Sequence, residues 1–394
     1  MPRVVIVGGG FAGVAMAQAF AAKLKRSDDT EVVLFEKNRY FYHTIGVSRA
    51  FAEEEYANKM FIPFDNVIPE HARSFVTIVH ALVTGIDGIR NLASFKRIQA
   101  DDKPEENVET LTFDYLIVAT GFSYTVPIKP AVAEYGRAET EAALKRVREA
   151  VANAKKILVV GGGSVGCEVA GDIAAYHPDK EVTILEPRAK IMAANNVNDK
   201  FRDKLYEAFE RLNIRVIRGE SLEERLSGNC FEKRTLRTDK GTEIESDIQL
   251  LCGGFHPVAE LVHAMDASLV DEHGAVKVNA RLQLDNEKYH HIFALGDVAN
   301  HASPKLAYIA ANQGRHLAAE LIAVIRMKGD LDSVKPVVVE THEVMILPLG
   351  PTVGVSQIPL FGGSVLGDWF TRLFKGKDMF AGRMWWMLGA KVPN

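Results

Sequence analysis

Two stretches of this 394-residue chain carry the same pattern of hydrophobic and polar positions. Each begins with a short β-branched run, continues through glycines and then repeats apolar positions at helical spacing: RVVIVGGGFAGVAMAQAF and KKILVVGGGSVGCEVAGDIAAY. A further apolar run, TEVVLFEK or KEVTILEP, follows each of them. This order predicts a strand, a helix and a parallel strand. Because the units start about 150 residues apart, they indicate a duplicated nucleotide-binding unit and exclude a short-period solenoid.

Other segments show weaker patterns. Short alternating runs between residues 72 and 118 predict antiparallel strands that close with a buried strand, Tyr115–Val118. Helical spacing of apolar residues predicts helices over 138–153, 199–212 and 305–328. Another apolar strand, in HIFALGDVA, ends in Gly-Asp near residue 296. We therefore predict the α/β class, with two Rossmann-like three-layer domains and a small α+β domain at the C-terminus.

The first unit contains the motif GxGxxG at its turn from strand to helix. Gly8 permits a tight turn, Gly10 lets backbone N–H groups approach a pyrophosphate, and Gly13 lets the helix pack closely on the strand. Glu36 ends the next strand, 23 residues after Gly13. A carboxylate at that position can accept hydrogen bonds from ribose hydroxyls. Strand, glycine turn, helix and terminal acid together predict a dinucleotide site.

The second unit repeats the motif with Gly161, Gly163 and Gly166, and Glu186 closes its second strand 20 residues later. Two complete fingerprints in one chain predict two dinucleotides. The carboxylate of Glu186 would repel a 2′-phosphate, so NADH is favoured over NADPH. Arg188 lies two residues further on and could accept that phosphate, which keeps NADPH as an alternative.

Three further strand ends separate this chain from simple dehydrogenases. LIVATG (Leu116–Gly121) predicts a buried strand with a tight turn beside the first unit, and LLCGG (Leu250–Gly254) takes the corresponding place after the second. IFALGDVA places Asp297 at a strand end, where an acid can bond the ribityl chain of a flavin. Alone, Asp297 could equally be a turn aspartate. In order with the other motifs, it favours FAD in the first unit.

Composition narrows the classes of function. The formal net charge of −4 argues against nucleic-acid binding, which needs a dense positive field. Cys167, Cys230 and Cys252 form no CxxC or CxxxxC arrangement, so neither a disulfide framework nor a metal site is expected. The low cysteine content fits a reducing compartment. No apolar run reaches the about 18 residues of a membrane-spanning helix. We therefore expect a cytoplasmic protein.

The order GxGxxG…E, ATG, GxGxxG…E and GD resembles that of the FAD-dependent pyridine nucleotide–disulfide oxidoreductase superfamily. Within it, the chain is similar to the branch of type II NADH:quinone dehydrogenases and AIF-like proteins, and most of all to the ferroptosis-suppressor, AIF-homologous family. FYHTIGVSRA, LVTGID, TDKGTEI, PKLAYIAANQG and the tail FKGKDMFAGRMWW also carry this similarity, which spans essentially the whole chain. The glycine motifs are superfamily-wide, whereas PKLAYIA and the tail are narrower.

The resemblance implies a domain order and a reaction. An FAD domain, residues 1–125 and 253–330, is interrupted by an NAD(P)H domain, residues 126–252. A C-terminal domain, residues 331–394, faces the acceptor or a membrane. NAD(P)H would reduce FAD, and the reduced flavin would reduce a quinone of the ubiquinone type. The family leads us to expect a monomer or a homodimer.

The resemblance also assigns site residues. FAD contacts are expected from the first glycine loop and from scattered positions beyond it: Gly8, Gly9, Gly10, Phe11, Ala12, Gly13, Glu36, Arg49, Val83, Thr120, Gly121, Asp297, Lys305 and Ala307. NAD(P)H contacts are expected from the second loop and two positions after it: Gly161, Gly162, Gly163, Ser164, Val165, Gly166, Glu186 and Gly253.

Two charged residues match catalytic positions of the family. Glu168 matches a carboxylate near the stack of nicotinamide and flavin, and Lys375 matches a C-terminal lysine near the flavin and the acceptor. The alternative for Glu168 is an acid that only favours the positive end of its helix.

A missing motif constrains how electrons leave the flavin. Disulfide reductases carry a CxxxxC pair shortly after the first ribose-binding acid, but this chain has NRYFYHTIGVSRAF there. No dithiol can relay electrons, so the acceptor must meet the flavin itself. His43 lies where the cysteines would be. It is a candidate proton donor to the reduced quinone, and the alternative is packing near the flavin.

The C-terminal tail interleaves apolar and basic residues. The apolar side chains are Leu360, Phe361, Trp369, Phe370, Leu373, Phe374, Phe380, Trp385 and Trp386, and the cations are Arg372, Lys375, Lys377, Arg383 and Lys391. Aromatic rings beside cations suit an interface with anionic lipid. The tail therefore predicts a quinone tunnel or a peripheral contact with a membrane, a lipid droplet or the mitochondrial surface. The alternative is an ordinary packed domain. Pro2 replaces the glycine of a myristoylated member, which argues against a lipid anchor.

Two other functions stay open at this point. The flavin could reduce a small iron–sulfur protein, which would require a charged docking patch near the flavin. The chain could instead be an AIF-like redox-sensing or death-signalling protein, which turns over slowly and keeps NAD in a long-lived charge-transfer complex.

Overall fold

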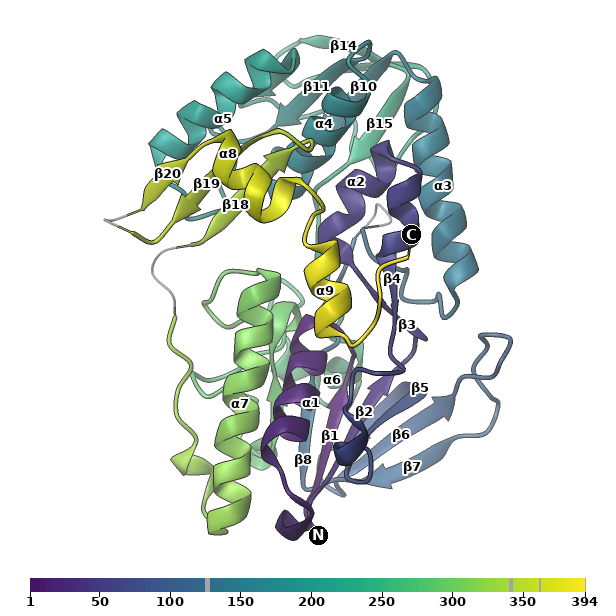
Figure 1. Ribbon diagram of the computed structural model, residues 1–394, viewed down its shortest axis with the longest axis vertical. Helices are drawn as coiled ribbons and strands as arrows, with labels where there is room; N and C mark the ends of the chain where they lie inside the picture. The colour runs from purple at the N-terminus through teal and green to yellow at the C-terminus, as the bar shows by residue number, and fades with distance from the viewer. Residues whose placement is uncertain (125–127, 340–342, 361–362, 394) are drawn as a thin grey trace.

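The N-terminal unit lies at the centre of a large sheet that forms the lower half of the molecule (Figure 1). This is a computed structural model, and it describes residues 1–124, 128–339, 343–360 and 363–393. Among them, seven strands pair in the order β17-β8-β1-β2-β5-β6-β7. Their bounds are β1 Arg3–Val7, β2 Glu31–Glu36, β5 Val76–Asp87, β6 Leu92–Arg97, β7 Glu109–Thr112, β8 Tyr115–Val118 and β17 Ile292–Ala294. β1 pairs in parallel with both β2 and β8, and its residues Val4–Val7 form a continuous buried apolar run, as is typical of a strand inside a parallel sheet.

The long strand β5 changes partner direction along its length. Val76–His80 pairs in parallel with β2, whereas Ala81–Asp87 pairs antiparallel with β6 across an irregularity between Val83 and Gly85. β6 and β7 continue the antiparallel part. The expectation of antiparallel strands in this region is therefore correct for the second half of β5, for β6 and for β7, and it is wrong for the first half of β5, which pairs in parallel with β2. Apolar alternation reports which face is buried, and it carries no information about the direction of the neighbouring strand.

Two long helices cover one face of this sheet. α1 (Phe11–Lys23) and α7 (Ala307–Met327) run side by side in the lower half of Figure 1. They pack closely because a Cβ atom on Gly314 would collide with the carbonyl oxygen of Ala12. The predicted helix over 305–328 is thus confirmed, with its first turn at Ala307. α6 (Glu260–Met265) is a short helix near the edge of this half, in contact with β5.

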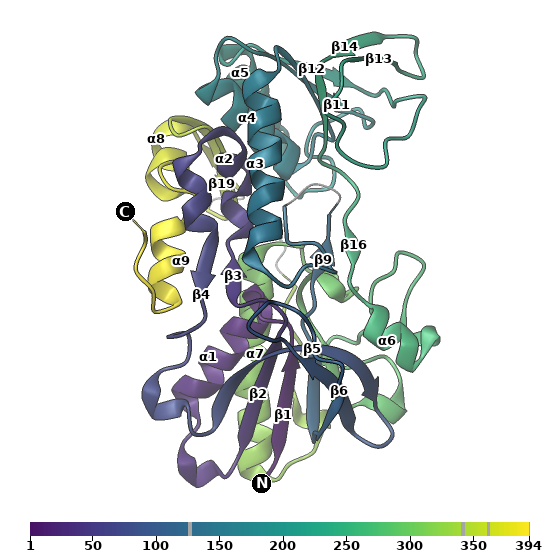
Figure 2. The ribbon, with the colours of Figure 1, turned by 90° about the vertical axis from the view of Figure 1, so that its right-hand side faces the viewer.

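The second unit forms a smaller parallel sheet in the upper half, with the strand order β12-β11-β10-β15. Its strands are β10 Lys156–Val160, β11 Glu181–Glu186, β12 Ile214–Arg218 and β15 Ile248–Leu251. Three helices accompany them: α3 Arg137–Asn153, α4 Ser164–Tyr176 and α5 Asp199–Arg211. The helices predicted over 138–153 and 199–212 are confirmed, and so is the α/β class with two Rossmann-like units. A hairpin, β13 (Arg234–Arg237) and β14 (Glu243–Ser246), projects beyond this sheet (Figure 2).

Two short strands mark where the chain passes between the halves. β9 (Phe122–Ser123) pairs antiparallel with β16 (His256–Pro257), and Figure 2 shows them side by side between the two sheets. The boundary expected between residues 125 and 126 lies outside the described residues. The crossing strands lie next to the strand ends that carry both glycine motifs.

A short N-terminal segment belongs to the lower unit in sequence but reaches the upper half. β3 (Tyr40–Tyr42) and β4 (Phe61–Pro63) form a small hairpin-like pair, and between them α2 (Val47–Ala52) packs against α4 and α3. Figure 1 shows α2 beside α4 in the upper half. Residues after Glu36 therefore meet the second unit directly.

The C-terminal segment contacts both halves. β18 (Met345–Leu349), β19 (Val353–Ile358) and β20 (Ser364–Leu366) form an antiparallel sheet beside α4 and α5. α8 (Asp368–Thr371) then runs into the helical turn η9 (Arg372–Gly376), and α9 (Ala381–Met387) lies between the halves in Figure 1. The indole N–H of Trp385 donates to the carbonyl of Lys59 at 3.0 Å. In the described part of the chain, no helix is long and apolar enough to cross a membrane.

Candidate functional site

A cavity of about 720 Å³ lies between the two halves, within the roughly 300–1,000 Å³ range of small-molecule sites. Most of the residues expected to contact FAD line it: Gly8, Gly9, Gly10, Phe11, Ala12, Glu36, Val83, Thr120, Gly121, Asp297, Lys305 and Ala307. Ser164 and Val165 of the second unit line the same cavity, together with Glu168 and Lys375. The fold thus brings the first glycine loop, the start of the helix after the second loop and both expected catalytic residues to one space. The other expected NAD(P)H contacts do not line this cavity: Gly161, Gly162, Gly163, Gly166, Glu186 and Gly253.

Backbone geometry explains the glycines of the first loop. Gly8 has a φ of +106°, and a Cβ atom there would lie 2.5 Å from the carbonyl oxygen of Ala119. Gly13 does not line the cavity, because its place is against the turn: a Cβ atom would collide with the carbonyl oxygen of Gly8. A Cβ atom on Gly10 would meet nothing within 4 Å. The loop therefore leaves open space where its N–H groups can approach a phosphate.

The carboxylate of Glu36 is held by the same loop. Its Oε2 atom accepts the N–H of Gly9 at 2.6 Å, and its Oε1 atom accepts the N–H of Asn38 at 2.8 Å. The side-chain amide of Asn38 also donates to Oε1 at 3.1 Å, whereas Oε2 can accept a second hydrogen bond. Because Glu36 also lines the cavity, the remaining acceptor position suits a ribose hydroxyl.

Three charged side chains lie deeper in the cavity. Burial raises the pKa of Asp297, although Lys129 and Lys305 oppose the shift. The Oδ1 atom of Asp297 is buried without a hydrogen-bond partner among the described residues. The ammonium of Lys129 lies 3.6 Å from the centroid of the Phe122 ring, and burial lowers its pKa. The Oδ1 atom of Asp297 is thus free to accept a hydrogen bond from a ribityl hydroxyl of FAD, and the ammonium groups of Lys129 and Lys305 suit its pyrophosphate.

Sequence reasoning missed Lys129. This lysine stands in a loop after LIVATG and belongs to no motif, so the only available signal was a lone cation near Gly121. The structure brings it beside Asp297 at the cavity wall. If FAD occupies the cavity, Lys129 and Asp297 would hold its polar middle, while the flavin ring would lie toward Glu168 and Lys375.

The second loop repeats the first in detail. Gly161 has a φ of +115°, and a Cβ atom on Gly166 would collide with the carbonyl oxygen of Gly161. The carboxylate of Glu186 accepts the N–H of Gly162 at 2.7 Å and that of Arg188 at 3.0 Å. A Cβ atom on Gly163 would meet nothing within 4 Å. This loop therefore offers the same ribose and phosphate positions as the first.

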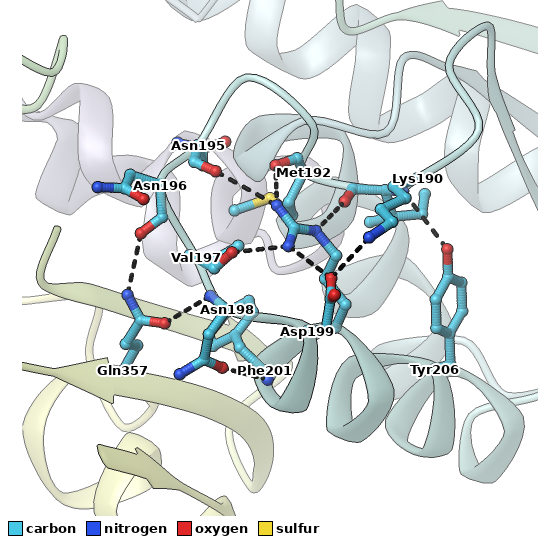
Figure 3. A network of polar contacts seen from close by, with 12 residues as sticks. Lys190, Met192, Asn195, Asn196, Val197, Asn198, Asp199, Phe201, Tyr206 and Gln357 are labelled. Atoms are coloured by element: carbon cyan, nitrogen blue, oxygen red, sulfur yellow. Dashed lines mark hydrogen bonds and ion pairs between the residues drawn. The ribbon is translucent and has the colours of Figure 1, made fainter. Parts of the chain in front are cut away.

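Hydrogen bonds hold the chain after Glu186 against the C-terminal sheet (Figure 3). The side-chain oxygen of Gln357 on β19 accepts the N–H of Asn198 at 2.9 Å, and its amide donates to the carbonyl of Asn196 at 3.0 Å. The guanidinium of Arg202 on α5 donates to the carbonyls of Val197 and Ile191. These contacts fix the loop that would border the adenosine of the second dinucleotide.

Glu168 and Lys375 form an ion pair, which the sequence did not predict. The Lys375 ammonium lies 2.5 Å from Glu168 Oε1, and the two side chains are 13% and 11% exposed. Burial raises the pKa of Glu168, and Lys375 opposes this shift. Both residues line the cavity next to Ser164 and Val165. The pair thus stands where the nicotinamide end of the second dinucleotide would meet the flavin.

Two expected site residues lie elsewhere. Arg49 was expected to contact FAD, but it does not line the cavity; it is 1% exposed and its Nε lies 2.8 Å from Asp172 Oδ1. His43 was a candidate proton donor, but it is fully buried, and its Nε2 donates to the carbonyl of Met379 at 2.9 Å. Burial lowers its pKa to about 4. His43 is therefore neutral near pH 7 and packs under the C-terminal segment.

Comparison with known proteins agrees with this geometry. The sequence profile of the pyridine nucleotide-disulphide oxidoreductase family matches residues 2–314. Apoptosis-inducing factor homolog B of Dictyostelium discoideum is 27% identical over 398 residues, covering 97% of this chain and 95% of that protein. Human ferroptosis suppressor protein 1 is 29% identical over 394 residues, covering 99% of this chain and 97% of the relative.

A solved structure shares the whole fold. The sulfide:quinone oxidoreductase of Aquifex aeolicus superposes with a TM-score of 0.75 at 16% identity, covering 100% of this chain and 93% of the other. Members of this family bind FAD and NAD(P)H, and the two loops and the cavity described above supply a place for each. The chain belongs to the pyridine nucleotide-disulphide oxidoreductase family and is an FAD-dependent NAD(P)H oxidoreductase.

Proposed function

We propose that this protein is an NAD(P)H:quinone oxidoreductase that works without a redox disulfide. The observation that carries the proposal is the wall of the cavity after Glu36. There, Tyr42, Thr44 and Ile45 face the cavity, and no cysteine lines it among the described residues. Bound FAD would accept a hydride from NAD(P)H and hand two electrons to the acceptor. The overall reaction, NADH + H⁺ + quinone → NAD⁺ + quinol, balances in atoms and charge.

The Glu168–Lys375 pair would prepare this reaction from the protein side. Glu168 stands on the first turns of α4, directly after the loop that would bind the second dinucleotide. The ammonium of Lys375 holds the carboxylate of Glu168 in one position, and a carboxylate so fixed can orient the carboxamide of the nicotinamide. The ammonium also places positive charge where a quinone oxygen gains electrons, which favours the reduced product. Glu186 supports a preference for NADH over NADPH.

The surface above Lys375 suits a lipid-borne acceptor. Trp369, Leu373 and Phe374 are 67%, 69% and 48% exposed on α8 and η9, the helical segment that also carries Lys375. Arg372 and Lys377 are exposed on the same segment. Exposed apolar side chains flanked by cations fit the headgroup region of an anionic membrane. We propose that this surface contacts a membrane peripherally; Phe361, part of the same expectation, lies outside the described residues.

The acceptor assignment is tested by pre-steady-state mixing. The purified yellow protein is reduced anaerobically with NADH and then mixed with a short-chain ubiquinone, a small iron–sulfur protein or buffer. Rapid flavin reoxidation by the quinone supports the proposal. Reoxidation by the iron–sulfur protein alone would assign a ferredoxin-type acceptor instead. A persistent long-wavelength charge-transfer band with negligible turnover would indicate a signalling flavoprotein.

The membrane contact has its own test. Sedimentation with vesicles of phosphatidylcholine and phosphatidylserine should retain the wild-type protein and release the Trp369→Ser/Leu373→Ser variant. The matched control is Ile89→Ser, which removes a side chain that is 69% exposed in the turn between β5 and β6, outside the C-terminal segment. The double variant should keep its rate with a soluble quinone. Equal binding by all three proteins would overturn the membrane assignment.

A further inference from the structure

A buried ion pair lies one helical turn away from the Glu168–Lys375 pair. Arg49 of α2 and Asp172 of α4 are 1% and 0% exposed, with 2.8 Å between Nε and Oδ1. A second nitrogen of the guanidinium donates to the carbonyl of Gly376 at 3.0 Å. Arg49 therefore joins three segments: the stretch after Glu36, the helix of the second unit and the C-terminal tail.

The two residues that Arg49 contacts, Asp172 and Gly376, lie close in sequence to the members of the catalytic pair, Glu168 and Lys375. Asp172 follows Glu168 by four residues, so both carboxylates lie on one face of α4. Gly376 is the residue after Lys375. By holding Asp172 and Gly376 together, Arg49 fixes the distance between the helix that carries Glu168 and the turn that carries Lys375.

The charges around Lys375 explain why it pairs with Glu168 and not with Asp172. Two buried carboxylates stand on α4, and Lys375 is among the groups that act on both of them. Burial raises the pKa of Asp172, which shows that its charge is costly unless a cation compensates it. Without Arg49, Asp172 would be an unpaired buried anion within reach of the Lys375 ammonium. Lys375 could then turn away from Glu168 toward Asp172.

Stability alone gives a weak reason for such a pair. Buried ion pairs are often no more stabilising than apolar side chains of similar volume, whereas they do select one geometry over others. At the position equivalent to Asp172, counted from the third glycine of the motif, the first unit has Ala19 on α1. A Rossmann-type helix therefore does not need a charge there.

We propose that Arg49 is a positioning residue: by occupying Asp172 and binding the Gly376 carbonyl, it holds Lys375 on Glu168 at the cavity. This inference rests on the catalytic place given to the Glu168–Lys375 pair. It replaces the expected contact between Arg49 and FAD, because Arg49 does not line the cavity. It also couples docking of the C-terminal tail to the chemistry of the cavity.

The test measures anaerobic flavin reduction by NADH in a stopped-flow instrument, together with FAD content. Because no acceptor is present, the result does not depend on whether quinone is the substrate. The Arg49→Met variant should retain FAD but reduce it more slowly, on the order of 10- to 100-fold, as expected for a misplaced catalytic group. The Lys375→Met variant should show the same loss, and Arg49→Met/Lys375→Met no further loss.

Rescue separates positioning from packing. Asp172→Asn, added to Arg49→Met, removes the anion that would capture Lys375, so the double variant should recover most of the rate. Arg49→Lys keeps the charge without the planar fork and should lie between wild type and Arg49→Met. Arg49→Met/Asp172→Asn and Arg49→Lys both avoid an orphaned carboxylate, so the test stands even if Arg49→Met does not fold.

The matched control is Arg211→Met. Arg211 on α5 binds Asp368 on α8 at 2.7 Å, so it also joins the second unit to the tail, but on the surface. Its flavin reduction should equal that of wild type. Loss of FAD from Arg49→Met without rescue by Asp172→Asn would make Arg49 an FAD ligand. Additive losses in Arg49→Met/Lys375→Met, or unchanged reduction in both single variants, would equally overturn the proposal.

Discussion

The two glycine units, residues 3–36 and 156–186, share their loops and differ in their helices. In both, the first glycine of the motif has a positive φ, the third packs under the first, and the acid accepts the N–H of the residue after the first, Gly9 or Gly162. The residues two and six positions after the third glycine are alanines in α1 and the carboxylates Glu168 and Asp172 in α4. The loop geometry serves any dinucleotide, whereas the helix carries what is specific to each site.

The neighbours of each helix account for this difference. α1 packs on α7 within the same half, and Gly314 lets the two helices approach closely. α4 faces α2 and the C-terminal segment, which come from other parts of the chain and bring Arg49 and Lys375. An apolar helix face suffices inside one layer. The face of α4 instead meets segments from other parts of the chain beside the cavity. Buried ion pairs hold these segments in a single geometry.

The largest effect should come from breaking the buried pair that only the second unit has. Asp172→Ala leaves Arg49 as an uncompensated buried cation and should lower the free energy of unfolding by about 3–5 kcal/mol. Glu141→Ala on α3 breaks a partly exposed pair with Arg137 and should cost only about 0.3–0.5 kcal/mol. Urea denaturation of both variants measures the difference. Equal losses would contradict the distinction between buried and exposed pairs.

The stretch after the first unit meets the tail through the neutral side chain of His43, and this contact should depend on pH. Burial lowers the pKa of His43 from 6.5 to about 4, so the unfolded chain binds more protons between these values. The contribution of the buried, neutral His43 to the free energy of unfolding is complete above pH 6.5. It falls by roughly 3 kcal/mol as the pH drops to 4, because each unit of pKa difference corresponds to about 1.36 kcal/mol. Denaturation of wild type and His43→Gln from pH 7 to 4 checks this, because the variant should lose that part of the slope.

The third glycines should show equal stability effects and different functional ones. Gly13→Ala and Gly166→Ala each force a methyl group into a carbonyl oxygen and should cost about 1–3 kcal/mol. The first variant should be purified with less FAD, and the second should keep FAD but bind NADH weakly. Flavin absorbance and NADH titration measure these losses. Gly163→Ala, whose Cβ meets nothing within 4 Å, should leave stability unchanged.

The smallest expected effect concerns the ribose-binding acids. Glu186→Ala removes a hydrogen bond to ribose worth about 1 kcal/mol, which should raise the KM for NADH roughly fivefold. Loss of its negative charge should at the same time lower the KM for NADPH, with Arg188 as the phosphate partner. Glu186→Ala/Arg188→Ala should abolish that gain. Unchanged KM values for both cofactors would show that Glu186 serves the loop alone.

Sequence reasoning succeeded where a site is built from neighbouring residues. The glycine loops directly follow β1 and β10, the acids end β2 and β11, and Asp297 comes shortly after β17, so local pattern and known backbone geometry suffice to place them. It misplaced His43 and Arg49, which lie in a stretch that begins beside the flavin cavity. That stretch lines the cavity as far as Ser48 in the first turn of α2, and nothing in FYHTIGVSRA indicates which of its side chains point inward.

The sequence by itself therefore determined the duplicated α/β plan, the two dinucleotide loops and the lack of a CxxxxC pair after Glu36. Only the tertiary structure decided the pairings Glu168–Lys375 and Arg49–Asp172, which join residues 207 and 123 positions apart. Loop geometry depends on residues in sequence contact, which a motif records. A buried charge depends on whichever distant segment supplies its partner, and that is known only once the segments have packed.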